Sequence, residues 1–514
     1  MASPFRPRAA ALTVTAALLS ALLAGCGDDA KEEDLTEQRL SWEDCPAPSD
    51  EQGGGNAPSP MPDDGEWQCA TMKVPRDWNK PKGDTIKLAL IRVKASGDPG
   101  RRIGSLVFNF GGPGGSGVTA LPSFGEDYTT LRTRYDLVSF DPRGVGRSAP
   151  VVCEDDEQLD EYFQQDATPD TAGERTSYLD ETKDFNEACE EHSGRMLPHV
   201  RTTDAARDMD LMRHLLGDAK LHYFGISYGT ELGGVYAHLF PRNVGRAVFD
   251  AVVDPTQTPE QGSLGQARGF QRALDNFAEN CVSQAEDCPL GDSAQDVKNR
   301  IARLLRDLDA KPIPGVFPRE LTQTAATNGI AQALYSKDFW QYLTEGLQQA
   351  YDGDGRVLML LSDSLNGRNE NGEYSNLAAA NVAINCADDR PRYDARFVER
   401  KLPEFRAASP LFGDFLAWSM LSCTDWPVRG AADHPDVSAP GAAPILVIGN
   451  TGDPATPYEG ARKMVQALGK GVGVELTYRG QGHGAYDSKN KCVQDAVNGY
   501  LLEGRTPAPG TVCS

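Results

Sequence analysis

The sequence predicts an α/β fold in which a mostly parallel sheet carries helices on both faces and a largely helical insertion interrupts the domain. Three observations predict it. Short apolar segments of strand length alternate with segments of helical periodicity between residues 67 and 255. The alternation stops over residues 256–430, where the pattern is helical, and it returns over residues 431–514. Because buried parallel strands are continuous apolar runs, one interrupted α/β domain accounts for all three observations.

The expected elements follow in chain order. In the first part of the core, apolar runs and alternation predict strands over residues 86–95, 105–110, 135–140, 221–224 and 244–253. Helical spacing of apolar residues predicts helices over residues 204–216 and 231–239. Within the insertion, residues 330–350 have the spacing of a helix. In the second part of the core, strands are expected over residues 444–449 and 474–478.

Composition limits the class of protein. The 514 residues include 51 Lys and Arg against 74 Asp and Glu, a net charge of −23. With 39% hydrophobic and 24% charged residues, the chain is neither a disordered chain nor a polytopic membrane protein. Phosphate binding needs a basic surface, so the charge argues against nucleic acid as the main partner.

Residues 1–25 have the features of a lipoprotein signal peptide. Arg6 and Arg8 precede an apolar run over residues 9–24, which is short for a membrane span and typical of a signal-peptide core. The run ends in Leu-Ala-Gly-Cys at residues 23–26, which resembles a bacterial lipobox with Cys26 as the lipidated residue. We expect an exported protein on the outer face of the cell membrane, anchored by lipid at Cys26 or released from there. An ordinary secretory signal that ends near a cysteine is the alternative.

Residues 26–66 are expected to form a tether and a loop. Residues 27–40 carry six acidic residues and almost nothing apolar, as a solvated tether does. Residues 46–65 are rich in Pro, Gly, Ser and Asp, which predicts a loop.

Cysteine counting supports export. The chain has 11 cysteines, and assigning Cys26 to lipid leaves an even number, as disulfide pairing in an oxidising compartment requires. Sequential pairing is one of the possible connectivities and would join residues 45–69, 153–189, 281–288, 386–423 and 492–513. Buried free thiols are the alternative. No Cys or Cys/His cluster has the spacing of a zinc site, so we expect no metal and no cofactor.

Ser227 is the expected nucleophile. It lies in a G-x-S-x-G pentapeptide, residues 225–229, between an apolar strand and a helical stretch. A sharp strand-to-helix turn crowds the backbone, so it needs glycine on both sides, and it holds the serine hydroxyl above the sheet. A serine in an ordinary glycine turn is the alternative.

A second glycine-rich segment, residues 111–117, follows the strand expected at 105–110. It lacks the Gly-Lys-Ser/Thr ending of a phosphate loop. An oxyanion-hole loop fits better than a merely flexible loop, because glycine lets a backbone N–H approach the developing oxyanion. We expect the N–H groups of Gly112 and Tyr228 to be the two donors.

A serine nucleophile needs a base and a carboxylate that orients the base. Of seven histidines, His483 is the natural choice because it follows the strand expected at 474–478. Asp453 follows the strand expected at 444–449. The order Ser227, Asp453, His483 is that of α/β-hydrolases and predicts this fold, although each residue alone could belong to a surface turn. Thr456 either supports Asp453 by a hydrogen bond or is a simple turn residue.

These motifs together resemble those of the secreted tripeptidyl aminopeptidases of actinomycetes, relatives of prolyl iminopeptidase in the α/β-hydrolase superfamily. The resemblance runs from about residue 67 to the C-terminus, and the layout with its lipobox is also similar to that of lipid-anchored cell-envelope serine proteases of mycobacteria. Prolyl iminopeptidases usually have His where Asn109 or Phe110 stands, so the resemblance does not imply strict proline specificity. The matching segments are residues 111–117, 141–146, 225–230, 383–388, 452–457 and 482–484.

The resemblance implies a serine exopeptidase that releases short peptides, tripeptides in the named family, from free N-termini through an acyl-enzyme. The insertion would act as a lid that admits only chain ends. Recognition of an α-amino group calls for a carboxylate in a half-buried pocket. Asp388 and Asp389 are the candidates, with Glu231 as a third, and a solvated acidic pair is the alternative. A secreted carboxylesterase or lipase with the same triad and a non-catalytic envelope-binding protein remain open as other functions.

Overall fold

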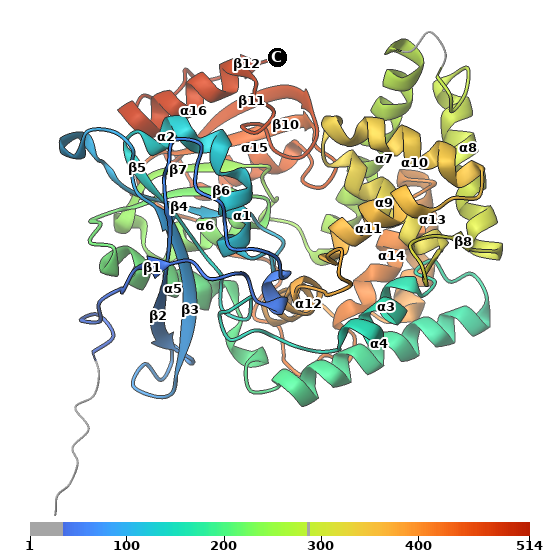
Figure 1. Cartoon of the computed structure of the whole chain (residues 1–514), viewed down its shortest axis with the longest axis horizontal. Coiled ribbons are helices and arrows are strands. Elements are labelled where there is room, and N and C mark those ends of the chain that lie inside the picture. Colours follow the sequence, from blue (N-terminus) through green and yellow to red (C-terminus); the bar gives the residue numbers. More distant parts are fainter. Residues whose placement is uncertain (1–33, 285–287) are drawn as a thin grey trace, which may run out of the picture. The chain divides into compact units, whose positions relative to one another are not determined.

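Ten strands form one sheet in the computed structural model, which describes residues 34–284 and 288–514 (Figure 1). The spatial order is β1-β2-β3-β5-β4-β6-β7-β10-β11-β12. Neighbours from β5 to β12 are parallel, and β1, β2 and β3 are antiparallel at one edge. This topology confirms the predicted α/β-hydrolase fold. The strands are β1 (Glu43–Asp44), β2 (Trp67–Pro75), β3 (Thr85–Val93), β4 (Gly104–Asn109), β5 (Tyr135–Phe140), β6 (Leu221–Ile226), β7 (Val244–Asp250), β10 (Ile445–Gly452), β11 (Gly473–Gln481) and β12 (Val512–Cys513).

Helices cover both faces of the sheet. Val107 and Phe108 of β4 belong to two different apolar clusters, because successive side chains of a strand point to opposite faces. The cluster of Phe108 includes residues of α1 (Gly117–Phe124), α2 (Thr129–Arg132) and α16 (Lys491–Glu503). The cluster of Val107 includes residues of α5 (Thr202–Leu215), α6 (Tyr228–Leu239), α12 (Leu377–Asp388) and α15 (Glu459–Leu468).

A largely helical insertion separates β7 from β10 and lies beside the sheet in Figure 1. It has an apolar cluster of its own, and it contains a short β-hairpin of β8 (Ile313–Pro314) and β9 (Glu320–Leu321). Besides α12, its helices are α7 (Pro259–Gln284), α8 (Ala294–Ala310), α9 (Gln323–Leu334), α10 (Trp340–Tyr351), α11 (Arg356–Asn366), α13 (Ala395–Ala408) and α14 (Gly413–Trp418).

Two helices that precede β6 in the chain, α3 (Asp156–Gln164) and α4 (Ala172–Ser193), connect the sheet to the insertion. Tyr178 of α4 packs in the cluster of the insertion and donates a hydrogen bond to the Trp418 carbonyl at 3.0 Å. Phe185, two turns further along α4, packs in the cluster of the sheet. Residues expected in the first part of the core therefore also support the insertion.

The expectation of one helix over residues 330–350 is wrong. α9 ends at Leu334, a 3-10 turn spans Lys337–Phe339, and α10 begins at Trp340. Ser336 caps the turn by accepting the Asp338 N–H, and the Tyr335 carbonyl accepts the N–H of His483 at 2.7 Å. The hydrogen bond between Tyr335 and His483, which is distant in the sequence, accompanies a break in the helix that the apolar periodicity does not predict.

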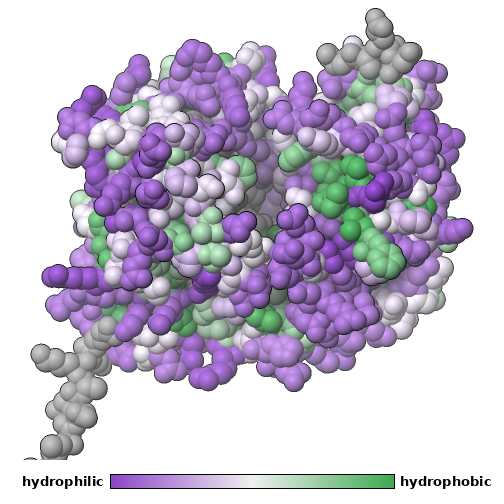
Figure 2. Space-filling model, viewed as in Figure 1, coloured by the Kyte–Doolittle hydropathy of each residue, from purple (hydrophilic) through white to green (hydrophobic). Residues whose placement is uncertain are grey.

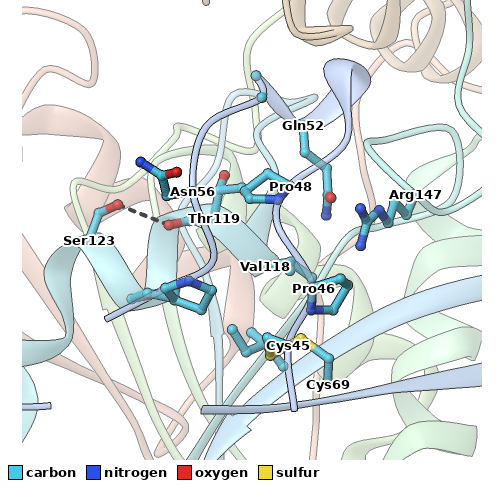
Figure 3. A pocket seen from close by; sticks show the side chains of 15 residues that line it. Cys45, Pro46, Pro48, Gln52, Asn56, Cys69, Val118, Thr119, Ser123 and Arg147 are labelled. Carbon is cyan, nitrogen blue, oxygen red and sulfur yellow. Dashed lines mark hydrogen bonds between the residues drawn. A yellow bond between two sulfur atoms is a disulfide. The ribbon is translucent and has the colours of Figure 1, made fainter. Parts of the chain in front are cut away.

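Residues 35–66, expected as part of the tether and loop, lie against the sheet. β1 pairs with β2, and the buried Gln52 donates to the Asp141 carboxylate at 2.7 Å. This segment and α1 enclose a pocket of about 330 Å³ whose lining includes Pro46, Val118 and Arg147 (Figure 3). The signal peptide over residues 1–25 and the lipidation site Cys26 lie outside the described residues.

Five disulfides join the ten described cysteines in the sequential pairing, 45–69, 153–189, 281–288, 386–423 and 492–513. Such a set is typical of a protein that matures outside the cytoplasm. A search of the described helices found none with the length and hydropathy to span a membrane. The surface is mostly hydrophilic, as the charge of −23 suggests, with a recess between the sheet-bearing and helical parts (Figure 2).

Candidate active site

Ser227 occupies the sharp turn from β6 to α6. Its backbone has φ 58° and ψ −128°, a strained conformation for a residue with a side chain. The flanking glycines are sterically required. A Cβ on Gly225 would lie 2.4 Å from the Gly229 carbonyl oxygen, and a Cβ on Gly229 would lie 2.4 Å from the Asn109 carbonyl oxygen. This is the geometry that the pentapeptide predicts for an exposed nucleophile.

Asp250, the last residue of β7, links the Ser227 turn to the loop that carries His483. Its backbone carbonyl accepts the Ser227 N–H at 3.1 Å. Its buried carboxylate accepts the N–H groups of Ala485 at 3.0 Å and Tyr486 at 2.9 Å. Burial raises the pKa of Asp250, and these hydrogen bonds oppose that rise. Asp250 was not among the expected site residues, and its one signal in the sequence is that it is an acid at the end of an apolar strand.

His483 and Asp453 form a close pair. The imidazole Nδ1 lies 2.9 Å from Asp453 Oδ1 and 3.1 Å from Oδ2, and the carboxylate is fully buried. Thr456 donates to Asp453 from both its N–H and its Oγ1 at 2.9 Å, and its Oγ1 lies 3.3 Å from His483 Nδ1. Thr456 therefore touches both partners, as the expectation of a supporting residue requires.

Tyr335 of the insertion contacts His483 in two ways. Its backbone carbonyl accepts the His483 backbone N–H. Its ring packs edge-on against the imidazole, with the ring centroids 5.1 Å apart and the ring planes at 85°. The sequence analysis missed Tyr335 because the helical pattern around it continues without a break.

Asp453 sets the titration of His483. Burial lowers the pKa of His483, but the charge of Asp453, its hydrogen bond and the charges of Asp487 and Asp250 together raise it more, and the net shift is upward from 6.5.

We expect the acid limb of kcat/KM to lie above pH 6.5. A base must be neutral to accept a proton, so a raised pKa leaves the protonated, inactive imidazolium in place up to a higher pH. The measurement is a pH profile on an ester without an amino group, so that the binding of an ammonium by Glu231, Asp388 and Asp389 does not contribute to it. An acid limb at or below pH 6.5 would show that Asp453 does not act on the base. In Asp453→Asn the limb should move to lower pH, while kcat falls by about 10⁴.

The loop after β4 lies against the Ser227 turn. Gly111 and Gly112 have φ 94° and 114°, and a Cβ on Gly111 would lie 2.8 Å from Ser227 Cβ. The backbone N–H groups of Gly112 and Tyr228 donate to no other group in the described part of the chain. Both remain free for a developing oxyanion.

Helix α12 packs on this loop. A Cβ on Gly114 would lie 2.7 Å from the Leu377 carbonyl oxygen, so only glycine permits the approach. Asn381 donates from Nδ2 to the Pro113 carbonyl at 3.0 Å. The insertion thereby holds the expected oxyanion loop in position.

The structure brings the three expected carboxylates together. Glu231 lies one turn beyond Ser227 on α6, and Asp388 and Asp389 lie at the end of α12. Burial, followed by the charges of Asp388 and Asp389, raises the pKa of Glu231 to about 8. Burial raises the pKa of Asp388 to about 7, and burial raises that of Asp389 to about 6.

The carboxylate cluster, defined as Glu231, Asp388 and Asp389, has few internal partners. Thr202 donates to Asp388 from its Oγ1 at 2.6 Å and from its N–H at 3.1 Å, and its Oγ1 lies 2.5 Å from the Tyr228 hydroxyl. None of the three carboxylates has a basic side chain of a described residue within 4 Å, and Glu231 accepts no hydrogen bond from one. The more distant charges of Arg392 and Arg201 lower the pKa values of Asp389 and Asp388 without outweighing burial. A half-buried set of acids with raised pKa values is suited to bind a cation from outside.

The chain is similar to known serine hydrolases. A family model described as "TAP-like protein" matches residues 409–513. The serine protease Hip1 of Mycobacterium tuberculosis is 38% identical over 458 residues, 87% of each chain. The tripeptidyl aminopeptidase of Streptomyces lividans is 33% identical over 485 residues, 92% of this chain and 86% of that protein. Carboxylesterase B of Mycobacterium tuberculosis is 35% identical over 458 residues, 87% of this chain and 86% of that protein.

Proposed function

This chain belongs to the TAP-like family of serine hydrolases, and on that premise we propose that it is an exopeptidase that releases short peptides from free N-termini. The observation that carries the proposal is the carboxylate cluster one helical turn from Ser227. A neutral ester has no group that would bind three acids, whereas the α-ammonium of a peptide does.

The proposed mechanism is acyl transfer. His483 removes the proton of Ser227 Oγ, which attacks the scissile carbonyl, while Asp453 holds the imidazole in its working tautomer. The N–H groups of Gly112 and Tyr228 stabilise the oxyanion. His483 then protonates the leaving amine, and water releases the acyl group from Ser227.

We propose tripeptides as the released unit, because the chain is 33% identical to a protein named tripeptidyl aminopeptidase. In this proposal the insertion over residues 256–430 is the lid that closes the site beyond the ammonium.

A chain-length series tests this unit. Amides of one chromogenic amine with one, two, three and four amino acids and a free N-terminus would be compared by kcat/KM. The tripeptide should exceed the single amino acid and the tetrapeptide by at least about tenfold, because only it places both the ammonium and the carbonyl. A rate that stays high with four or more residues would contradict an exopeptidase and indicate an endopeptidase.

A carboxylesterase is the second candidate, because carboxylesterase B is as similar to the chain as the two peptidases are. It predicts fast hydrolysis of short-chain esters and no peptide cleavage. In that case the carboxylate cluster would have no substrate group to bind.

We also propose export with lipid attachment at Cys26. The five disulfides and the signal-like sequence of residues 1–25 support export, and the cysteine after Leu-Ala-Gly supports the attachment.

A further inference from the structure

Two phenylalanines form an apolar shelf beside the oxyanion loop. Phe110 follows the last residue of β4, and Phe124 is the last residue of α1. Their rings stack with centroids 5.6 Å apart and planes at 28°. Phe124 is 47% exposed and Phe110 is half-buried, so the pair offers apolar area to a ligand.

The shelf begins next to the nucleophile. Phe110 directly precedes Gly111, whose Cβ position would lie 2.8 Å from Ser227 Cβ and 3.1 Å from the Tyr228 nitrogen. Successive Cα atoms are about 3.8 Å apart, so the backbone of Phe110 lies within one residue of the loop that contacts Ser227.

The shelf and the carboxylate cluster belong to elements on opposite faces of the sheet. Phe110 packs against the apolar cluster that contains Phe108 and Tyr128, on the face of α1 and α16. The carboxylate cluster lies on α6 and α12, whose apolar residues belong to the cluster on the other face. If the ammonium is held on the α12 face, the α1 face is available to the part of the peptide beyond the scissile bond.

The His483 loop lies on the same side as the shelf. The Tyr128 ring is 6.4 Å from that of Phe110 and stacks on Tyr486, three residues beyond His483, with centroids 5.5 Å apart. His483 must protonate the leaving amine, so the leaving peptide passes on this side.

We propose that Phe110 and Phe124 form the subsite for the first residue of the leaving peptide and select an apolar or aromatic side chain there. This inference rests on the proposed exopeptidase function. Stacking on the exposed Phe124 ring and burial of the apolar side chain would favour phenylalanine over glycine at this position.

The test uses pairs of free-amine peptides that share their first three residues and differ only in the fourth, phenylalanine or glycine. Product formation by the protein without residues 1–26 would be followed by chromatography. The preference is the ratio of kcat/KM for the phenylalanine peptide to kcat/KM for the glycine peptide. We expect the wild type to prefer phenylalanine by about tenfold. Phe124→Ala should reduce this ratio to near one and leave the glycine peptide unaffected. Phe110→Leu, which keeps apolar volume and so protects folding, should reduce it partly.

Phe317→Ala is the matched control, because Phe317 is 94% exposed in the hairpin between β8 and β9 and should leave the ratio unchanged. An unchanged ratio in Phe124→Ala and Phe110→Leu, with both peptides cleaved, would overturn the subsite and leave the exopeptidase function intact. An equal loss on both peptides would show a structural role only and would also overturn it. If neither peptide is cleaved while esters are, the proposed function fails and the subsite with it.

Discussion

Ser227→Ala is expected to lower kcat by about 10⁵ to 10⁶ on a tripeptide amide, because the acyl-enzyme can no longer form. The remaining rate would come from binding and from the oxyanion donors alone. The variant has a side chain no larger than that of serine at the strained turn, so folding should be preserved and a thermal melt would verify this.

A serine-reactive phosphonate probe gives a second readout of the same prediction. It should label the wild type once and fail to label Ser227→Ala. Ser123→Ala is the control, because Ser123 is exposed on α1 and bonds only to the Thr119 carbonyl, and it should keep full labelling and full activity. Residual activity above about 1% of the wild type, or retained labelling, would place the nucleophile elsewhere. An unlabelled wild type would favour the non-catalytic binding protein.

The second large effect concerns the carboxylate cluster. Glu231→Gln is expected to raise KM for free-amine peptides by about 10- to 100-fold, because a charged hydrogen bond to the ammonium is lost. Hydrolysis of an ester without an amino group should stay the same. Glu370→Gln, at an exposed position of the insertion, is the matched control. An equal loss on ester and peptide would mean that Glu231 supports the fold around Ser227 and does not bind substrate.

The same cluster predicts a pH dependence of KM. Its pKa values of about 8, 7 and 6 mean that protons are bound near neutral pH, and a cationic ligand binds better once they leave. KM for free-amine peptides should therefore fall as pH rises from 6 to about 7, below the α-amino pKa of about 7.7 to 8.0, and Glu231→Gln should weaken this dependence. The corresponding ester should show only the acid limb of His483.

The sequence alone predicted the parts of the fold that depend on local pattern. Glycines on both sides of Ser227 predicted the sharp turn because no other residue fits there, and strand-length apolar runs predicted the parallel sheet. The even number of cysteines left after Cys26 suggested disulfides without settling their connectivity, and the five disulfides present have the sequential one. The acids at 388 and 389 were chosen for their chemistry, but only the folded chain shows that Glu231 approaches them.

Contacts between distant segments could not be predicted. The break at Tyr335 exists because its carbonyl pairs with His483, and no local signal in the sequence outweighs the helical pattern there. Nothing in the sequence distinguishes Asp250 from the other acidic residues, of which the chain has 74 in all. Its role is visible only in the folded chain, where it bonds to two loops. The attachment of α4 to the insertion depends on Tyr178, which is an ordinary aromatic residue in the sequence.

The central claim is that the enzyme acts only on peptides with a free amino terminus. The most direct measurement compares two forms of one tripeptide amide, one with a free and one with an acetylated N-terminus. The enzyme is the protein without residues 1–26, and the Ser227→Ala variant of that protein is the blank. The account predicts that the free peptide is cleaved at least about 100-fold faster in kcat/KM, because acetylation removes the charge that the carboxylate cluster binds. Equal cleavage of the two peptides would contradict it.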